Sequence, residues 1–229
     1  MEQCKGLIAG IDIGYSKIQA SVYSYNSRNV QTVKLTEDSK EKTSLANVVA
    51  ECMRATGTSQ IQSICVTIPD YHSDEISAVR DTLKKCGVSD GRGQVLSRVE
   101  SFAYYAYRQK KELYQHGTVL MDYNASGIDV YRLYCNKIGD MQYILQEHTL
   151  SQPEGSTIEK ASHSVTLYMT EYFKKHRASS VYLTGMGFDV DRLPDEFTKV
   201  LVAGRKAFVG QNLYVRGACF AALEYISPQ

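Results

Sequence analysis

Apolar residues in the first half of the chain alternate between runs typical of strands and spacings typical of helices. Two apolar runs, at 7–13 and 18–25, flank a glycine-containing bend, which predicts a two-strand hairpin. Between Ser44 and Gly57 the apolar residues recur at helical spacing, with a serine to cap the helix and a glycine to end it. The other elements predicted here are strands at 29–35, 64–68 and 95–99, a helix at 73–86, and a helix that carries Phe102 and Tyr107 and runs to the charged stretch at 108–112.

The second half of the chain repeats this plan. A new unit begins near Gln115, because residues 118–122 again form an apolar strand that ends in aspartate. Such a duplication predicts an α/β protein of two lobes related by a pseudo-twofold axis, each a mixed sheet flanked by helices, with a cleft between them. We predict domains at 1–114 and 115–229. The repeated elements are strands at 118–122, 128–135, 141–148 and 181–184 and a helix at 164–175.

Composition indicates which classes of partner the protein has and in which cell compartment it is found. The formal net charge is +1 and the basic residues are scattered, which argues against nucleic acid and anionic membranes as partners. The start of the chain lacks the pattern of a secretory signal, and no run is apolar enough to span a bilayer, so we expect a cytoplasmic protein. The six cysteines show no zinc-type spacing and are expected to be reduced and mostly buried. The chain ends just after a predicted helix, which is compatible with its being a piece of a longer protein.

Two aspartates stand where strands meet turns. Asp12 precedes the bend at Gly14, and such a carboxylate at the mouth of a hairpin can reach metal-bound water. Asp122 ends an apolar strand, where a carboxylate is costly unless a metal, a proton or a hydrogen-bond donor satisfies it. The alternative for both is structural: an ordinary hairpin turn at Asp12, and a turn-initiating aspartate that accepts backbone N–H groups at Asp122.

Motifs in order along nearly the whole chain resemble the actin-like ATPase superfamily, which includes actin, hexokinase-type sugar kinases and heat-shock chaperone ATPases. The resemblance implies two ribonuclease H-like lobes without the accessory subdomains of longer members. The segments that carry it are 10–14 and 119–130 for the two phosphate loops, 66–70 for a chaperone-type strand, 99–107 for the connecting helix, 182–187 for the adenosine loop and 214–219 for the closing helix.

The resemblance also implies roles for single residues. It places Asp12, Asp122 and Glu100 in catalysis and the two aspartates at Mg²⁺, with ATP as the nucleotide. It assigns nucleotide contacts to Gly14, Tyr15, Lys17, Ser126, Gly127, Gly185 and Gly187. The structural alternatives are a helix cap for Glu100, a solvated side chain for Lys17, and a tight loop for Gly185 and Gly187.

The second phosphate loop departs from the family pattern. The family has Asp-x-Gly-Gly-Gly-Thr, whose glycines let backbone amides converge on phosphate. Here residues 122–127 read Asp-Tyr-Asn-Ala-Ser-Gly, and Tyr15 stands in the first loop where the family has a small residue. We therefore expect weakened or absent nucleotide binding.

Two functions from different classes follow. The first is a pseudoenzyme: a domain with a degenerate nucleotide site that acts as a binding or scaffold module for a protein partner or a second copy of itself. The alternative is an active Mg-ATP-dependent ATPase or small-molecule kinase. A chaperone-like or filament-forming switch is disfavoured by the missing insertions. Seventeen tyrosines and no tryptophan indicate either a contact surface or half-exposed packing.

Overall fold

The computed structural model describes residues 6–14, 17–35, 44–124, 127–135, 142–151 and 158–226. The chain forms two compact units. The first comprises Met1–Tyr105 together with Asn212–Gln229, and the second comprises Ala106–Gln211.

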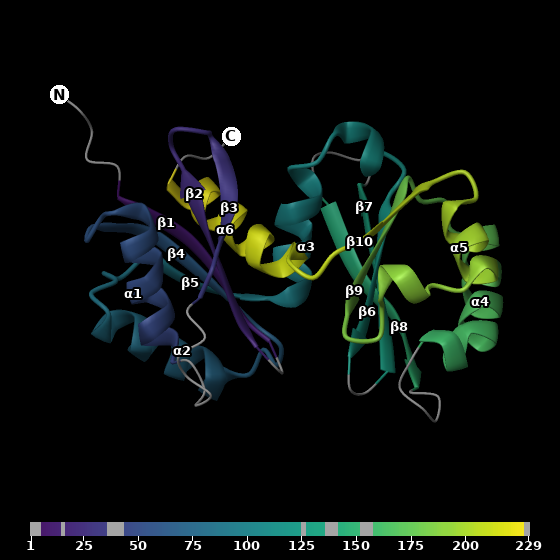
Figure 1. Ribbon diagram of the computed structural model, residues 1–229, viewed down its shortest axis with the longest axis horizontal. Coiled ribbons are helices and arrows are strands. Elements are labelled where there is room, and N and C mark those ends of the chain that lie inside the picture. Colours follow the sequence, from purple (N-terminus) through teal and green to yellow (C-terminus); the bar gives the residue numbers. More distant parts are fainter. Residues whose placement is uncertain are drawn as a thin grey trace. The chain divides into compact units, whose positions relative to one another are not determined.

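Unit 1 is built on a mixed five-stranded sheet (Figure 1). The predicted hairpin is present, with β1 and β2 antiparallel and Asp12 opposite Gln19. β4 pairs with β1 in parallel, as expected for strands separated by a helix. The strand order is β3-β2-β1-β4-β5, with β1 at Leu7–Ile13, β2 at Ile18–Ser24, β3 at Asn29–Val33, β4 at Ile61–Ile68 and β5 at Gly93–Ser97.

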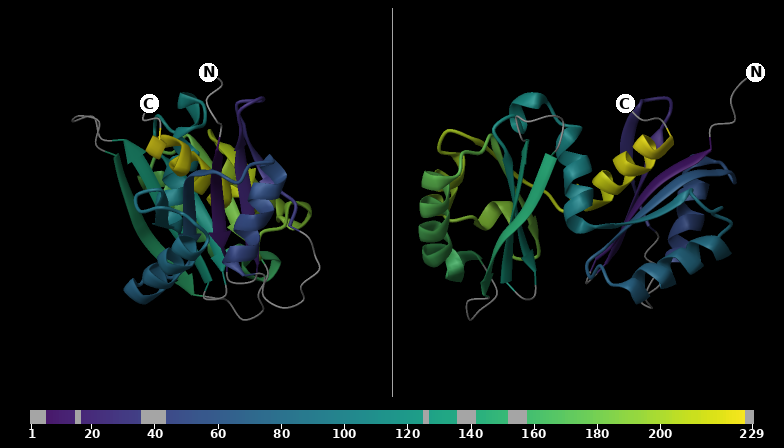
Figure 2. Two further views of the ribbon diagram at one scale, coloured as in Figure 1. Left: turned by 90° about the vertical axis from the view of Figure 1, so that its left-hand side faces the viewer. Right: turned by 180° about the vertical axis from the view of Figure 1, so that it is seen from behind.

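Helices cover both faces of this sheet. Helix α1 (Leu45–Thr56) has the predicted ends, because the Ser44 side chain accepts a hydrogen bond from Asn47 N and Gly57 adopts a left-handed conformation with φ 65°. α1 and α2 (Ser73–Lys85) share one apolar core with the sheet. α6 (Leu213–Ile226) packs on the other face, through Ala218, Ala221 and Ala222 (Figure 2). α3 (Arg98–Tyr107) follows β5 directly.

The position of α6 differs from the predicted division at 114/115, which placed residues 212–229 in the second lobe. α6 lies so close to β1 that a Cβ atom on Gly10 would be 2.2 Å from Cys219 N and 2.4 Å from Val215 O. Ser21 Oγ also donates to Val215 O at 2.8 Å. Glycine on β1 and alanines on α6 permit this approach, so the last helix of the chain belongs to the first compact unit.

Unit 2 repeats the sheet topology of unit 1, with the strand order β10-β9-β6-β7-β8. β6 is antiparallel to β7 and parallel to β9, as β1 is to β2 and β4. Its core lies between the sheet and two helices. The elements are β6 at Thr118–Asn124, β7 at Gly127–Cys135, β8 at Gln142–Ser151, β9 at Ser180–Gly185, β10 at Lys206–Val209, α4 at Ile158–Lys175, α5 at Asp195–Val202 and the 3-10 helices η1 at Lys111–Leu113 and η2 at Val190–Arg192.

The order of elements confirms the predicted duplication. Each half runs through three strands, a helix, a strand, a helix, a strand and a helix, apart from the two short 3-10 helices. α4 begins at Ile158, earlier than the expected start at Ser164, so the connection after β8 is shorter than the sequence indicated. Among the described helices, none has both the length and the apolar character needed to cross a membrane.

The cysteines for which the structure describes a state are free thiols. Cys52, Cys65 and Cys219 are buried in unit 1 and Cys86 is half-buried. Burial raises the pKa of the Cys52 and Cys219 thiols to about 12, so both are protonated at neutral pH. These residues pack as small apolar side chains, as predicted.

Candidate functional site

Asp12 lies near the end of β1 and is 5% exposed. It pairs with Gln19 on β2 and Thr67 on β4, so these three side chains form a row across one face of the sheet. Gly14 closes the hairpin, since its N–H donates to Lys17 O at 2.9 Å. A Cβ atom on Gly14 would lie 2.8 Å from the same carbonyl oxygen, which explains the glycine. Lys17 is exposed, consistent with a solvated side chain, and Tyr15 lies outside the described residues.

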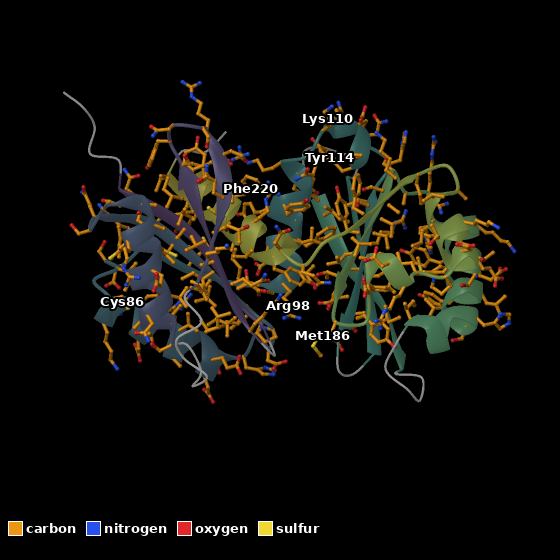
Figure 3. The ribbon with its side chains drawn as sticks, in the orientation of Figure 1. Cys86, Arg98, Lys110, Tyr114, Met186 and Phe220 are labelled. Atoms are coloured by element: carbon orange, nitrogen blue, oxygen red, sulfur yellow. The ribbon has the colours of Figure 1, made fainter. Side chains whose placement is uncertain are left out.

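Arg98 shares this end of the sheet with Asp12. It is the first residue of α3, directly after β5 (Figure 3). A Cβ atom on Gly14 would lie 3.6 Å from Arg98 Nη2 and 3.9 Å from Asp12 Oδ2, so guanidinium and carboxylate both border the hairpin bend. The guanidinium carbon is 5.0 Å from the ring centroid of Tyr214 on α6, which helps to orient it. A permanent cation therefore stands beside the first candidate phosphate loop.

Glu100 caps the helix that Arg98 begins. Its Oε2 accepts hydrogen bonds from Ser97 N and Ser97 Oγ, both at 2.8 Å, while Glu100 N donates to Ser97 Oγ at 3.2 Å. This reciprocal pair is a capping box, with serine at the N-cap and glutamate three residues later. The structure thus engages Glu100 in the alternative role considered from sequence, and its catalytic role stays a prediction.

Replacing Glu100 by alanine should lower the free energy of unfolding by about 1 kcal/mol, because the exposed Ser97 N–H loses its side-chain acceptor. Urea denaturation followed by circular dichroism measures this loss. Glu100→Gln should recover most of it, since an amide oxygen still accepts the bond. Equal losses in both variants would mean that the charge, and not the cap, stabilises the helix.

Thr67 and Ser101 form a buried polar contact under α3. Their hydroxyl groups hydrogen-bond to each other, and neither residue is exposed. This contact connects the start of α3 to β4 beside Asp12. Sequence reasoning missed both residues, although a threonine within the apolar run at 64–68 was a signal.

Asp122 occupies the equivalent position in unit 2. It is 3% exposed on β6 and pairs with Asp129 on β7 and Thr184 on β9. The Asn124 side-chain amide donates to Asp129 Oδ2 at 2.7 Å, so one of the two acidic groups of this loop is held by the loop itself. Gly127, with φ 138°, begins the return strand. Ser126 lies outside the described residues.

Tyr123 fills the space beside the candidate adenosine loop. A Cβ atom on Gly187 would lie 1.9 Å from Tyr123 Cδ1, and one on Gly185 would lie 2.2 Å from Tyr123 O. Tyr123 is 2% exposed, and its ring meets Phe188 edge to face, with 5.5 Å between ring centroids. Gly185 and Gly187 therefore make room for a side chain and backbone of the same unit. Their contact with a nucleotide stays a prediction.

Gln211 holds this loop closed from the other side. Its Nε2 donates to Gly185 O at 2.8 Å, and its Oε1 accepts from Gly185 N at 3.2 Å. Met186 at the tip is 76% exposed. The loop is therefore fixed at its base and presents one apolar side chain to solvent. Sequence reasoning did not identify Gln211, because nothing local marks a residue that acts across the fold.

The predicted site residues thus fall into one group in each unit. Unit 1 joins Asp12 and Gly14 with the unpredicted Arg98 and Thr67. Unit 2 joins Asp122 with Thr184, while its glycines enclose Tyr123. Within the described ranges, no three or more His, Cys, Asp or Glu side chains gather as a metal site would require.

Comparison of the sequence with known families gives a match over most of the chain. The family model described as "Family of unknown function (DUF5716) C-terminal" matches residues 26–229. No curated protein matches the chain in sequence.

Solved structures show the fold. A ROK hexokinase from Thermus thermophilus superposes with a TM-score of 0.61 at 13% identity, covering 97% of this chain and 100% of its own. The ethanolamine utilization protein EutJ from Carboxydothermus hydrogenoformans superposes with a TM-score of 0.54 at 13% identity, covering 97% of this chain and 91% of its own. A Bacteroides thetaiotaomicron protein with an actin-like ATPase fold and unknown function superposes with a TM-score of 0.51 at 11% identity, covering 96% of this chain and 95% of its own. The chain therefore has the two-lobed actin-like ATPase fold.

Proposed function

The chain belongs to the DUF5716 C-terminal family, a family of unknown function, and we propose that it is a pseudo-ATPase whose reshaped nucleotide site makes it a binding or scaffold module. The observation that carries this proposal is the guanidinium of Arg98 beside Asp12 and Gly14.

A fixed cation at this position opposes recruitment of Mg²⁺. Phosphoryl transfer depends on a metal ion that neutralises phosphate charge, and a carboxylate such as Asp12 attracts that ion by its own charge. A guanidinium stays protonated at all ordinary pH values, so Arg98 offsets this attraction permanently. Arg98 is also part of the chain, so it does not lose the translational entropy that a Mg²⁺ ion loses when it binds from solution.

The second loop supports the same conclusion by a different route. Asn124 carries a side chain where the family has glycine, and that side chain is bonded to Asp129. The ring of Tyr123 packs against Gly187, in the loop that resembles the family's adenosine site. Both contacts use groups of the chain where a nucleotide would need open backbone.

Asp12 in unit 1 and Asp122 in unit 2 are each of the residue type that Mg²⁺ takes as a ligand, because carboxylate oxygens coordinate this ion. When bound, the ion supplies charge neutralisation at phosphate oxygens. Each carboxylate fits that role by type and burial, and we expect Arg98 to lower the affinity of Asp12 for the ion. The partner that the module serves is a protein or a second copy of the chain, because a net charge of +1 offers little general attraction to nucleic acid.

Wild-type protein should bind Mg-ATP no more tightly than about 1 mM, and Arg98→Ala should bind free Mg²⁺ about tenfold more tightly than wild type, since removal of the cation restores the full charge of Asp12. Isothermal titration calorimetry measures both constants. Arg98→Lys is the matched control and should stay weak, because it retains the charge. Arg80→Ala, which removes an exposed arginine from α2, should behave as wild type.

An active ATPase or small-molecule kinase is the second candidate. It is favoured by the burial of Asp12 and Asp122 at equivalent strand positions, 5% and 3% exposed. Micromolar Mg-ATP affinity in the wild type, with phosphate release that Asp122→Asn abolishes, would establish this candidate and exclude the pseudo-ATPase.

A further inference from the structure

A surface pocket of about 820 Å³ lies in unit 2, away from the residues described above. It borders the segment around η1, between the labelled Lys110 and Tyr114 in Figure 3, and the N-terminal ends of β9 and β10. Asp122 and Gly185 lie near the C-terminal ends of β6 and β9, which are parallel. The pocket is therefore at the opposite end of this sheet from the candidate nucleotide loop.

The pocket is strongly basic. Its lining includes five lysine or arginine residues and one carboxylate, that of Glu112. His116 adds an imidazole. Basic residues are otherwise scattered along a chain of net charge +1, so this concentration is a local feature of the fold. The basic residues are Lys174, Lys175, Arg177, Arg205 and Lys206.

Three of these cations already have protein partners. Lys206 Nζ lies 3.2 Å from Glu112 Oε1, and Lys174 Nζ lies 2.5 Å from Glu171 Oε1. Arg205 Nη1 donates to Val200 O at 2.6 Å. These contacts hold three of the five basic side chains that line the pocket.

Lys175 and Arg177 are the remaining cations. Both are exposed, and neither forms an ion pair with a carboxylate in the part of the chain that the structure describes. Lys175 is in the last turn of α4, where a cation also compensates the helix dipole. Arg177 lies beyond the helix, so that explanation does not extend to it. Lys175 acts on the charge of Glu171 only at longer range, so both side chains are available to an external anion.

The shape and lining of the pocket restrict the ligand. Its volume is in the range of small-molecule sites. The Phe173 ring is the one Phe, Tyr or Trp ring in its lining, and the Arg205 guanidinium covers it, with 3.6 Å between the guanidinium carbon and the ring centroid. Apart from the imidazole of His116, this lining offers no uncovered ring to stack on a base, while N–H donors of the kind that bind phosphate are abundant.

We propose that this pocket binds a compact polyanion, a small molecule that carries two or more phosphate groups, through Lys175 and Arg177. The other cations of the wall add to the attraction. The site is independent of the nucleotide site and does not rest on the proposed function.

Titration calorimetry of the full chain with inorganic tripolyphosphate tests the proposal. Wild-type protein should bind in the micromolar range, and its affinity should fall with added salt because the pocket is open to solvent. The variant with Lys175→Glu and Arg177→Glu should bind at least about tenfold more weakly, since two attractive charges become repulsive. Lys199→Glu reverses one exposed cation on α5 outside the pocket; as the control for charge alone it should change affinity less than about twofold.

Other outcomes would overturn the inference. Absence of heat at about 1 mM tripolyphosphate would show that the pocket binds no such ligand. An equal loss in Lys199→Glu would indicate general charge attraction only. Tighter binding of a poly-glutamate peptide would make this a peptide site. Arg98→Ala should leave tripolyphosphate binding unchanged, and a loss there would place the anion at the nucleotide loop. Should the double variant unfold, Arg177→Gln alone carries the test.

Discussion

Replacing Gly10 by alanine is expected to lower the free energy of unfolding by about 3 kcal/mol or more, the upper end for added volume in a packed core. The new Cβ would lie 2.2 Å from Cys219 N and 2.4 Å from Val215 O. Both are backbone atoms of α6, so no rotation of a side chain relieves the clash. α6 must shift away from β1, which opens the core that it shares with Ile8 and Cys65.

Urea denaturation followed by circular dichroism measures the loss at Gly10, and Gly57→Ala provides the comparison. Gly57 has φ 65° and nothing within 4 Å of a Cβ, so its substitution strains the backbone without a clash. That strain costs about 1 kcal/mol. If Gly10→Ala were no more destabilising than Gly57→Ala, the packing of α6 on β1 would be refuted.

Gly187→Ala should destabilise unit 2 by about 3 kcal/mol, because its Cβ would lie 1.9 Å from Tyr123 Cδ1. Tyr123→Ala should cost a similar amount through the cavity that it leaves. The double variant should lose less than the sum, by at least about 1 kcal/mol, since removal of the ring makes room for the new methyl group. This coupling is the direct measure of whether Tyr123 occupies the space beside the loop.

A second double-mutant cycle, of Gly204→Ala with Tyr123→Ala, is the control for the Gly187 and Tyr123 cycle. Gly204 has φ 74° and nothing within 4 Å of a Cβ. Gly204→Ala and Tyr123→Ala should therefore add within about 0.5 kcal/mol. Additivity in the Gly187 pair as well would contradict the packing described here and leave the loop free to hold a nucleotide.

Much of the fold was predictable because each half carries its own local signals. The apolar runs at 7–13 and 118–122, each followed by a glycine-containing turn, predicted the first strand of both sheets correctly. Burial of Asp12 and Asp122 followed from their place at the ends of these runs. The division of the chain was less predictable, since α6 packs on residues more than 190 positions earlier, as the bond from Ser21 to Val215 shows.

The candidate site shows the same contrast. Glu100 carried a sequence signal for a capping box, three residues after Ser97, and the structure has that box. Arg98 lies between them, and no sequence pattern identified it. Its place in the candidate site depends on contacts with β1 and α6, which are distant in sequence. The same holds for Tyr123 and Gly187, whose contact joins segments that no local pattern connects.

The sequence by itself determined the duplicated plan of strands and helices and the two acidic strand ends, because periodicity, caps and turn residues act over a few positions. Only the tertiary structure decided that a guanidinium borders Asp12, that a tyrosine ring fills the loop at Gly187, and that five cations line one pocket. Charge and volume act through space, so their effect depends on which distant segments the fold brings together.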